Sequence, residues 1–134
     1  MKISHLATEQ RNENSMNIDR MATIELVQTI NNEDKMVASA VEKVLEDIAK
    51  AIDLGAERFN EGGRLIYIGA GTSGRLGALD AIELTPTYSV SPKRAFGILA
   101  GGKEAMYAAV EGAEDSVELA IEDLKAVHLT EKDV

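Results

Sequence analysis

The segment 69–74, with the sequence Gly-Ala-Gly-Thr-Ser-Gly, contains the residues best suited to bind an anion. It follows the short apolar run 65–68, which is typical of a buried parallel strand. The three glycines remove the steric limits that a Cβ places on a tight turn. Thr72 and Ser73 add two hydroxyls where a helix is expected to begin, and Arg75 adds a guanidinium suited to phosphate or carboxylate. Free N–H groups and the helix dipole favour an anion at such a turn, so the segment predicts a phosphate site.

The spacing Gly-x-Gly-x-x-Gly is also typical of dinucleotide-binding folds. Such folds place an acidic residue about 20 positions further on, at the end of the second strand, to bind the ribose. The second predicted strand of this chain ends in Leu-Ala-Gly-Gly at 99–102, without an acidic residue. A triphosphate-binding P-loop requires a lysine directly after its last glycine, and this chain has Arg75 there. A purely structural turn would account for the glycines but not for the two hydroxyls and the arginine.

The rest of the pattern alternates between helices and strands. The first part predicts an irregular arm at 1–18, a short helix from Asp19 or Thr23 to 31–32, and a long amphipathic helix at 33–60. The second part predicts a strand at 65–68, a helix of two or three turns closed at 85–86, a strand at 95–100, and two helical pieces from Met106 onward with a break at 111–114. This order predicts an α/β fold with a parallel sheet. Two strands make a poor sheet, and the final residues 129–134 are typical of the approach to a third strand.

The composition excludes several classes of function. The chain has 134 residues, enough for one domain, and a formal net charge of −9, which disfavours nucleic acid and anionic membranes as partners. It contains no cysteine, which excludes disulfides, cysteine nucleophiles and thiolate metal sites and fits a reducing cytoplasm. The sequence has neither a signal peptide pattern nor a membrane-spanning stretch, so a soluble cytoplasmic protein is expected.

Several segments together resemble the SIS (sugar isomerase) family, and within it the etherases. They are LATEQRNENSMNID at 6–19, NNEDK at 31–35, GGRLIYIGAGTSGRLG at 62–77, ILAGG at 98–102 and AVEGAEDS at 109–116. The resemblance covers essentially the whole chain. It implies an α/β, SIS-type doubly wound parallel sheet flanked by helices, with an N-terminal arm and helices at 1–60 and the first half of a SIS domain at 61–134. It also implies that etherases of this kind continue beyond Val134, with a second phosphate loop and further helices.

The resemblance also implies the chemistry and the residues that perform it. It implies cleavage of the D-lactyl ether of a phosphorylated amino sugar by elimination and then addition of water, in cell-wall sugar recycling. Glu83 is similar to the family's proton donor to the lactyl oxygen, and Glu114 to its base at C2. The phosphosugar-binding residues implied by the loop are Gly71, Thr72, Ser73 and Arg75. This chemistry needs neither a metal nor a redox cofactor, and the family implies a homo-oligomer, expected as a dimer.

The residues next to the two glutamates also indicate which protonation state each side chain favours. Ile82 and Leu84 flank Glu83, and apolar neighbours favour the protonated form of a carboxyl that they bury. Glu114 lies near a predicted helix start, where the helix dipole favours the carboxylate. Ile82, Leu84 and Thr85 depart from the family pattern around Glu83, so the shape of the pocket there is not carried over. A SIS module that binds a sugar phosphate without chemistry needs the loop but neither glutamate, and it remains the alternative.

Overall fold

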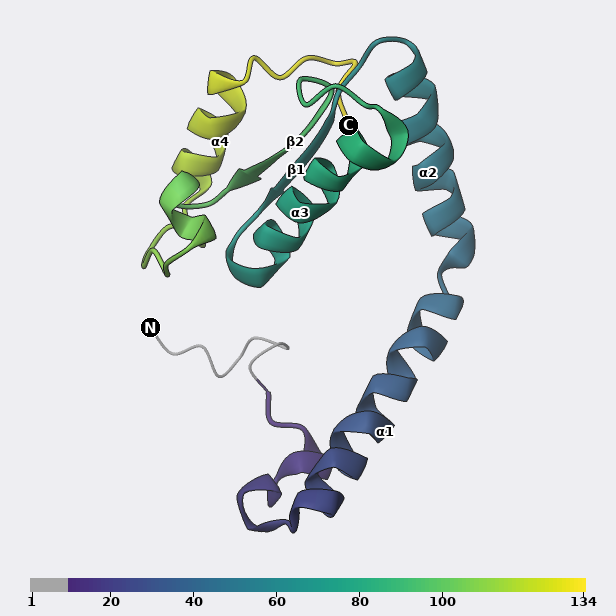
Figure 1. The fold of residues 1–134 in the computed structure, drawn as a ribbon, viewed down its shortest axis with the longest axis vertical. Helices are drawn as coiled ribbons and strands as arrows, with labels where there is room; N and C mark the ends of the chain where they lie inside the picture. Colours follow the sequence, from purple (N-terminus) through teal and green to yellow (C-terminus); the bar gives the residue numbers. More distant parts are fainter. Residues whose placement is uncertain (1–9) are drawn as a thin grey trace. The chain divides into compact units, whose positions relative to one another are not determined.

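The computed structural model describes residues 10–134 (Figure 1). Its contacts divide the chain into one unit that ends at Ile48 and another at Ala49–Val134. The predicted arm at 1–18 lies partly outside the described residues. The elements described are two 3-10 helices (Glu13–Ser15, Ile18–Arg20), α1 (Thr23–Glu42), α2 (Leu45–Asn60), β1 (Leu65–Gly69), α3 (Gly71–Tyr88), β2 (Ala95–Leu99), the 3-10 helix η4 (Lys103–Met106) and α4 (Val117–Ala126). No helix in this described range is long and apolar enough to cross a membrane.

Two of the segments that carry the family resemblance contact each other in the first unit. The side-chain amide of Asn12 donates to Glu33 Oε2 at 2.6 Å, and that of Asn14 donates to Glu33 Oε1 at 2.7 Å. These two donors hold the pKa of Glu33 below its ordinary value because they stabilise the carboxylate. The contact therefore fixes the segment before α1 against the middle of that helix.

Helix α1 continues through Asn31-Asn32, so the prediction that a helix ends there is wrong. Asparagine disfavours a helix interior by well under about 1 kcal/mol, which tertiary contacts override. The predicted single helix at 33–60 is instead two helices, because the chain breaks at Lys43 and Val44. There the N–H groups donate three residues back, to the carbonyls of Ala40 and Val41, in a 3-10 turn. Neither glycine nor proline marks this break, and the sequence pattern could not reveal it.

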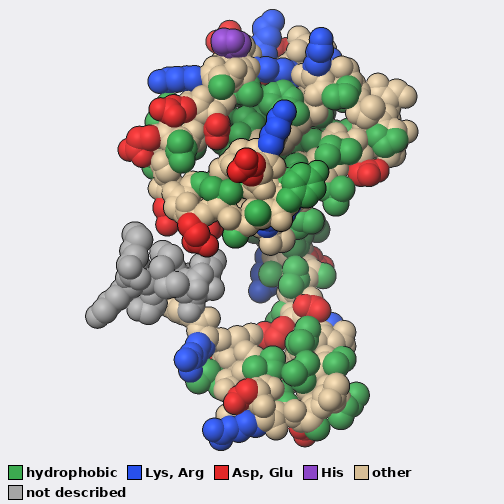
Figure 2. All heavy atoms as spheres, turned by 60° about the vertical axis from the view of Figure 1, so that its left-hand side comes forward, with side chains coloured by type: hydrophobic (Ala, Val, Ile, Leu, Met, Phe, Trp, Pro, Cys, Tyr) green, Lys and Arg blue, Asp and Glu red, His purple; other side chains and the backbone are tan. Residues whose placement is uncertain are grey.

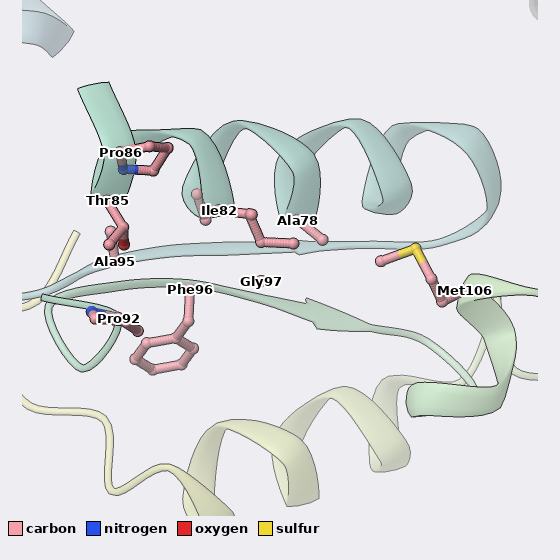
Figure 3. Close-up of a pocket in the computed structure, with 10 residues that line it drawn as sticks. Ala78, Ile82, Thr85, Pro86, Pro92, Ala95, Phe96, Gly97 and Met106 are labelled. Carbon is pink, nitrogen blue, oxygen red and sulfur yellow. The ribbon is translucent and has the colours of Figure 1, made fainter. Parts of the chain in front are cut away.

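Strands β1 and β2 pair in parallel, with Leu65 opposite Ala95 and Gly69 opposite Leu99, as the two apolar runs predict. Helix α3 packs on the pair through three small buried residues, Gly74, Ala78 and Ala81. The approach is close: a Cβ on Gly97 of β2 would lie 2.7 Å from the Cα of Ala78. Helix α4 lies on the opposite side of the two strands from α3 (Figures 1 and 3). This is the expected layering of helices on both faces of a parallel sheet.

Helix α3 is longer than the two or three turns predicted. It runs past Pro86 to Tyr88 and ends at Ser89, whose left-handed backbone (φ 57°) caps the helix. Pro86 removes one backbone hydrogen bond, but it lies in the last turn, where that loss does not stop the helix. Thr85 closes the end by donating its hydroxyl to the carbonyl of Val90 at 2.9 Å. Glu83 therefore lies within a helix and not at a helix end.

The segment between β2 and α4 is mostly irregular. The predicted helix from Met106 is wrong: a 3-10 helix, η4, ends at that residue. Residues 111–114 are non-helical as predicted, with Gly112 in the left-handed region at φ 78°, but no α-helix directly precedes them. Helix α4 begins as expected after Ser116, whose Oγ accepts the N–H of Leu119 at 3.2 Å. The backbone can turn sharply at Gly112 because glycine has no Cβ.

The final residues lie beside the free edge of β1. The N–H of Val134 donates to the carbonyl of Arg64 at 2.9 Å, and the N–H of Ile66 donates to the carbonyl of Val134 at 2.7 Å. Bonds to the residues on both sides of Leu65 follow the pattern of a parallel ladder. Strand β1 therefore has β2 along one edge and Val134 beside its other edge. Open α/β sheets bind their ligands outside the carboxyl ends of such parallel strands, which directs attention to the end of β1.

Arg64 and Asp133 hold this returning segment in place. The Asp133 side chain is 2% exposed and accepts Arg64 Nη2 at 2.6 Å, Arg64 Nε at 2.9 Å and the N–H of Thr130 at 2.8 Å. Arg64 also donates to the carbonyls of Val127 and His128. The Arg64 guanidinium, together with Thr130, holds the pKa of Asp133 well below its ordinary value. The segment before Val134 is therefore fixed to the start of β1 by a nearly buried ion pair.

Asp133→Asn is expected to lower the free energy of unfolding at pH 7 by about 3 kcal/mol, because it leaves the Arg64 charge without its partner. The pKa of Asp133 is lower in the folded protein than in the unfolded chain, where it is about 4. The stabilisation from the ion pair is therefore complete above about pH 4, and it is lost as the pH falls from there through the folded-state pKa. Urea unfolding at pH 7 and pH 2 measures both effects. Asp19→Asn is the control, because Asp19 and Arg20 form an exposed pair at 3.8 Å. An equal loss at both pH values would contradict the prediction.

Candidate functional site

The glycine segment forms a turn from β1 into α3. Ala70 is extended, Gly71 opens the helix at φ 53°, and the N–H of Gly74 donates to the carbonyl of Ala70 at 3.0 Å. Gly74 lies against the end of β1, since a Cβ there would be 2.4 Å from the carbonyl oxygen of Gly69. The start of an 18-residue helix therefore sits at the carboxyl end of β1. Its first-turn N–H groups and the positive end of its dipole suit an anion, as predicted.

Two adjoining pockets lie at this end of the sheet. One, of about 190 Å³, is lined by Gly71 and Arg75 from α3 and by Glu111 and Glu114 from the segment before α4. The other, of about 110 Å³, lies toward α4, and Ala70, Ala100 and Glu114 line both. The structure thus brings three predicted site residues together: Gly71, Arg75 and Glu114. Thr72 and Ser73 are exposed beside Gly71, and Glu114 is exposed three residues before α4 begins.

A larger pocket of about 570 Å³ lies elsewhere, between α3 and β2 (Figure 3). Its lining is Ala78, Ala81, Ile82, Thr85, Pro86, Pro92, Ala95, Phe96, Gly97 and Met106. None of these side chains titrates, so this pocket offers no acid–base chemistry. The smaller pockets beside the glycine turn are the better candidate for a reaction.

Arg75 contacts backbone carbonyls in the structure. Its Nε donates to the carbonyls of Ala105 at 2.9 Å and Met106 at 3.2 Å, and its Nη2 donates to that of Ala108 at 3.4 Å. These bonds tie η4 and the residues after it to the first turn of α3. Direct binding of a phosphate by Arg75 stays a prediction, and the observed contacts give the residue a positioning role.

Arg75→Lys is expected to loosen the segment from Ala105 to Glu114, because one ammonium group cannot span three carbonyls as the guanidinium does. Amide hydrogen exchange in that segment should accelerate about ten-fold, a loss of about 1.4 kcal/mol of local stability. Arg58→Lys is the matched control, since Arg58 donates to the carbonyl of Glu131 at 2.7 Å. Unchanged exchange from 105 to 114 in the Arg75 variant would contradict the positioning role.

Glu83 lies far from the glycine turn. It is 12 residues after Gly71 in α3, and at 1.5 Å per residue this is about 18 Å along the helix axis. Its side chain is exposed, and its neighbour Ile82 is 60% exposed, so the condition that apolar neighbours bury Glu83 is not met. The structure therefore does not bring Glu83 and Glu114 together within one chain.

A contact that the pattern did not predict joins β1 to α3. The hydroxyl of Tyr67 donates to the carboxylate of Asp80, one turn before Glu83. Burial, and next the Asp80 carboxylate, raise the pKa of Tyr67 to about 12. The pair holds the middle of α3 on the strand. The sequence shows only that a tyrosine lies in the apolar run 65–68, and it does not reveal that Asp80 is the hydrogen-bond partner of this tyrosine.

The comparisons with known proteins agree with the fold. Residues 36–134 match the family model described as the glucokinase regulatory protein N-terminal SIS domain. The chain is 69% identical over 134 residues to a protein of Enterococcus faecalis named N-acetylmuramic acid 6-phosphate etherase 1, and covers 45% of it. It is 62% identical over 133 residues to the N-acetylmuramic acid 6-phosphate etherase of Clostridium beijerinckii, which is 99% of this chain and 44% of that protein. It is 60% identical over 134 residues to the N-acetylmuramic acid 6-phosphate etherase of Lactobacillus gasseri, and covers 45% of it. The chain spans less than half the length of these curated relatives.

Proposed function

We propose, from the premise that this chain belongs to the family of the glucokinase regulatory protein N-terminal SIS domain, that the full-length protein is an N-acetylmuramic acid 6-phosphate etherase. The observation that carries the proposal is the 69% identity, over the whole chain, to a relative of that name. The structure supports it with a helix start suited to phosphate and a carboxylate beside it. The substrate is then a phosphorylated amino sugar with a D-lactyl ether at C3.

The reaction proceeds through the open-chain form of the sugar. The aldehyde at C1 makes the C2 proton acidic, and a base removes it. The C3–O bond then breaks, the lactyl oxygen takes a proton from an acid, and D-lactate leaves. Water adds to C3 of the alkene and a proton returns to C2, which gives N-acetylglucosamine 6-phosphate. The net change is hydrolysis of one ether bond, and it requires one ionised and one protonated carboxyl group.

The proposed roles combine the placement of the residues with the family resemblance, and the role of Glu83 rests on the resemblance alone. The N–H groups and hydroxyls of Gly71, Thr72 and Ser73 bind the phosphate at the start of α3, and Arg75 supports them from the first turn. Glu114, which lines both pockets beside the turn, is the base at C2. Glu83 is the acid that protonates the lactyl oxygen. No step assigned to these residues calls on a metal or a redox cofactor.

The decisive experiment is an assay of the full-length protein on N-acetylmuramic acid 6-phosphate. We expect D-lactate and N-acetylglucosamine 6-phosphate in equal amounts, each detected by a coupled assay or mass spectrometry. In water labelled with ¹⁸O, the label should enter C3 of the sugar and not the lactate, because the C3–O bond is the one that breaks. Saturable binding of the substrate without lactate release would contradict the proposal.

That outcome would favour a second candidate, a SIS module that senses a sugar phosphate without chemistry. The separation of Glu83 from the turn within one chain is the observation in its favour. The etherase is preferred because the relatives named for that activity match the whole chain. In the etherase proposal the enzyme acts in amino-sugar catabolism and peptidoglycan recycling in the cytoplasm, as a homodimer.

A further inference from the structure

The pocket of about 110 Å³ beside Glu114 has no group of the substrate assigned to it. It lies at the carboxyl ends of β1 and β2, and residues of the segment 113–116 and of helix α4 complete its lining. We call it the α4 pocket. Its occupant follows from the proposed function, on which this inference rests: phosphate binds at the start of α3, and Glu114 removes the C2 proton.

The position of Glu114 limits which group of the substrate faces the α4 pocket. Glu114 lines this pocket and also the pocket that Gly71 and Arg75 line. With the phosphate beside Gly71 and C2 at Glu114, the α4 pocket faces the groups that C2 and C3 carry. These are the acetamido group at C2 and the lactyl ether at C3.

Helix α4 supplies one carboxylate to the α4 pocket. Ser116, Ala120 and Asp123 follow one another at spacings of four and three, so they share one face of the helix, and all three line the pocket. Asp123 is half-buried, and its side chain makes no hydrogen bond or ion pair with the residues that the structure describes. An ionised carboxylate only accepts hydrogen bonds, so Asp123 is available to a ligand group that donates one.

The rest of the α4 pocket suits a small and partly apolar group. Ala113 is 7% exposed, and Ile68 and Leu119 also line the cavity. A volume of about 110 Å³ equals that of about four water molecules at about 30 Å³ each. An acetamido group has four non-hydrogen atoms, with one N–H donor and one methyl group. It therefore matches the pocket in size, in apolar character and in its single donor.

The lactyl group is a poor match for the same pocket. It is larger and ends in a carboxylate, and both Glu114 and Asp123 line the cavity. Like charges repel more strongly where water is partly excluded. The chain also has a formal net charge of −9, and acidic side chains are visible over the face of Ala49–Val134 that Figure 2 shows. The neutral acetamido group is the occupant that this charge favours.

We propose that the α4 pocket binds the 2-acetamido group of the substrate and that the Asp123 carboxylate accepts the N–H of this group. The sugar is then held at two points, by its phosphate at the start of α3 and by its acetamido group at α4. C2 lies between these points, and its proton is directed toward Glu114. Asp123 is a residue that determines specificity, and it selects sugar phosphates with an acylated amine at C2.

The first test measures the affinity of full-length protein for two sugar phosphates by isothermal titration calorimetry. N-acetylglucosamine 6-phosphate carries the acetamido group, and 2-deoxyglucose 6-phosphate has no donor at C2. Asp123→Ala should weaken binding of the first about ten-fold, because a hydrogen bond to a charged group is lost, and should leave binding of the second within about two-fold. Asp123→Asn keeps an acceptor oxygen and should retain part of the affinity.

Glu122→Ala is the matched control for Asp123→Ala. Glu122 is an exposed acidic residue of α4 and lies outside the lining of the α4 pocket, so both affinities should stay at wild-type values. Asp123→Ala would overturn the proposal if it bound N-acetylglucosamine 6-phosphate as tightly as the wild type does. Equal losses of affinity for the two sugar phosphates would overturn it as well.

The second test fills the α4 pocket. Ala120→Leu adds three carbon atoms to its lining, and leucine is nearly as favourable as alanine in a helix. Binding of N-acetylglucosamine 6-phosphate should weaken at least about ten-fold, whereas binding of 2-deoxyglucose 6-phosphate should stay within about two-fold. Ala126→Leu is the control, because Ala126 is exposed at the end of α4 and outside this lining. Unchanged binding of both ligands by Ala120→Leu would contradict the proposal.

These binding measurements also separate the inference from the function on which it rests, because neither ligand carries a lactyl ether. Wild-type protein that releases no lactate from N-acetylmuramic acid 6-phosphate would refute the etherase, while selective loss of binding in the variants would still support the acetamido pocket. Lactate release by the wild type, with no selective loss in the variants, would keep the etherase and refute the pocket.

Discussion

Replacement of Glu114 by glutamine in the full-length protein is expected to lower the rate of lactate release by about 10²- to 10⁴-fold. Glutamine keeps the size of the side chain but cannot take the C2 proton. Because Glu114 is exposed, its loss leaves the fold intact, and circular dichroism and the melting temperature should match those of the wild type. A coupled assay for D-lactate measures the rate.

The neighbouring residue supplies the control. Asp115 is also exposed, and it has no place among the residues that line the two pockets beside the glycine turn. Asp115→Asn should therefore retain the wild-type rate within about two-fold, in line with other surface substitutions. In deuterated water, the Glu114 variant should also stop exchange at C2, because that proton is the one the base removes. Normal exchange and turnover by Glu114→Gln would remove the residue from the mechanism.

Gly74→Ala is expected to destabilise the fold strongly, with a loss of about 3 kcal/mol in the free energy of unfolding. An added Cβ would lie 2.4 Å from the carbonyl oxygen and 2.6 Å from the carbonyl carbon of Gly69, and 3.0 Å from Leu99 Cδ1. The first two atoms belong to the backbone of β1 and cannot rotate away. Relief of the clash requires the start of α3 to move from the strand, so phosphate binding should weaken as well.

Gly55→Ala is the matched control for this substitution. A Cβ at Gly55 would meet only Val134 Cγ1, at 3.9 Å, which is an ordinary van der Waals contact. Gly55 lies inside α2, where alanine is favoured over glycine by about 1 kcal/mol. The control should thus be neutral or stabilising in urea unfolding. Inhibition by inorganic phosphate provides the binding measurement. A Gly74 variant with wild-type stability and inhibition would contradict the close packing of turn and strand.

The glycine turn shows how far the residues alone could define the site. The apolar run, the glycines and the two hydroxyls predicted a strand, a turn and a helix start, and all three are present at β1 and α3. These elements depend on neighbours in the sequence, so local chemistry is sufficient to specify them. Arg75 was predicted to bind phosphate from the chemistry of its side chain alone, and this stays a prediction. Only the folded chain shows that its guanidinium reaches the carbonyls of Ala105, Met106 and Ala108.

Helix lengths were harder to predict than helix identities. Local residues that weaken a helix, such as Asn31-Asn32 and Pro86, were interpreted as ends, but both helices continue through them. The cost of such residues is small, or falls in a last turn, and the rest of the helix outweighs it. The break at Lys43-Val44 has no marker residue, because it is a change in hydrogen-bond spacing. The error at Pro86 changes the setting of Glu83, which lies inside α3 and not at its end, but not its distance along the helix from the turn.

By itself, the sequence determined the α/β class, the two parallel strands, the glycine turn at a helix start and, through its resemblance, the family and both candidate glutamates. Each of these depends on contiguous motifs or on periodicity. The tertiary structure alone decided that β1 has β2 on one side and Val134 on the other, that Glu114 lies beside the turn, and that Glu83 does not. These facts depend on how far helix α3 runs and on which segments the sheet brings together. The glycine turn is therefore a local feature, whereas the position of Glu114 beside it depends on the tertiary structure.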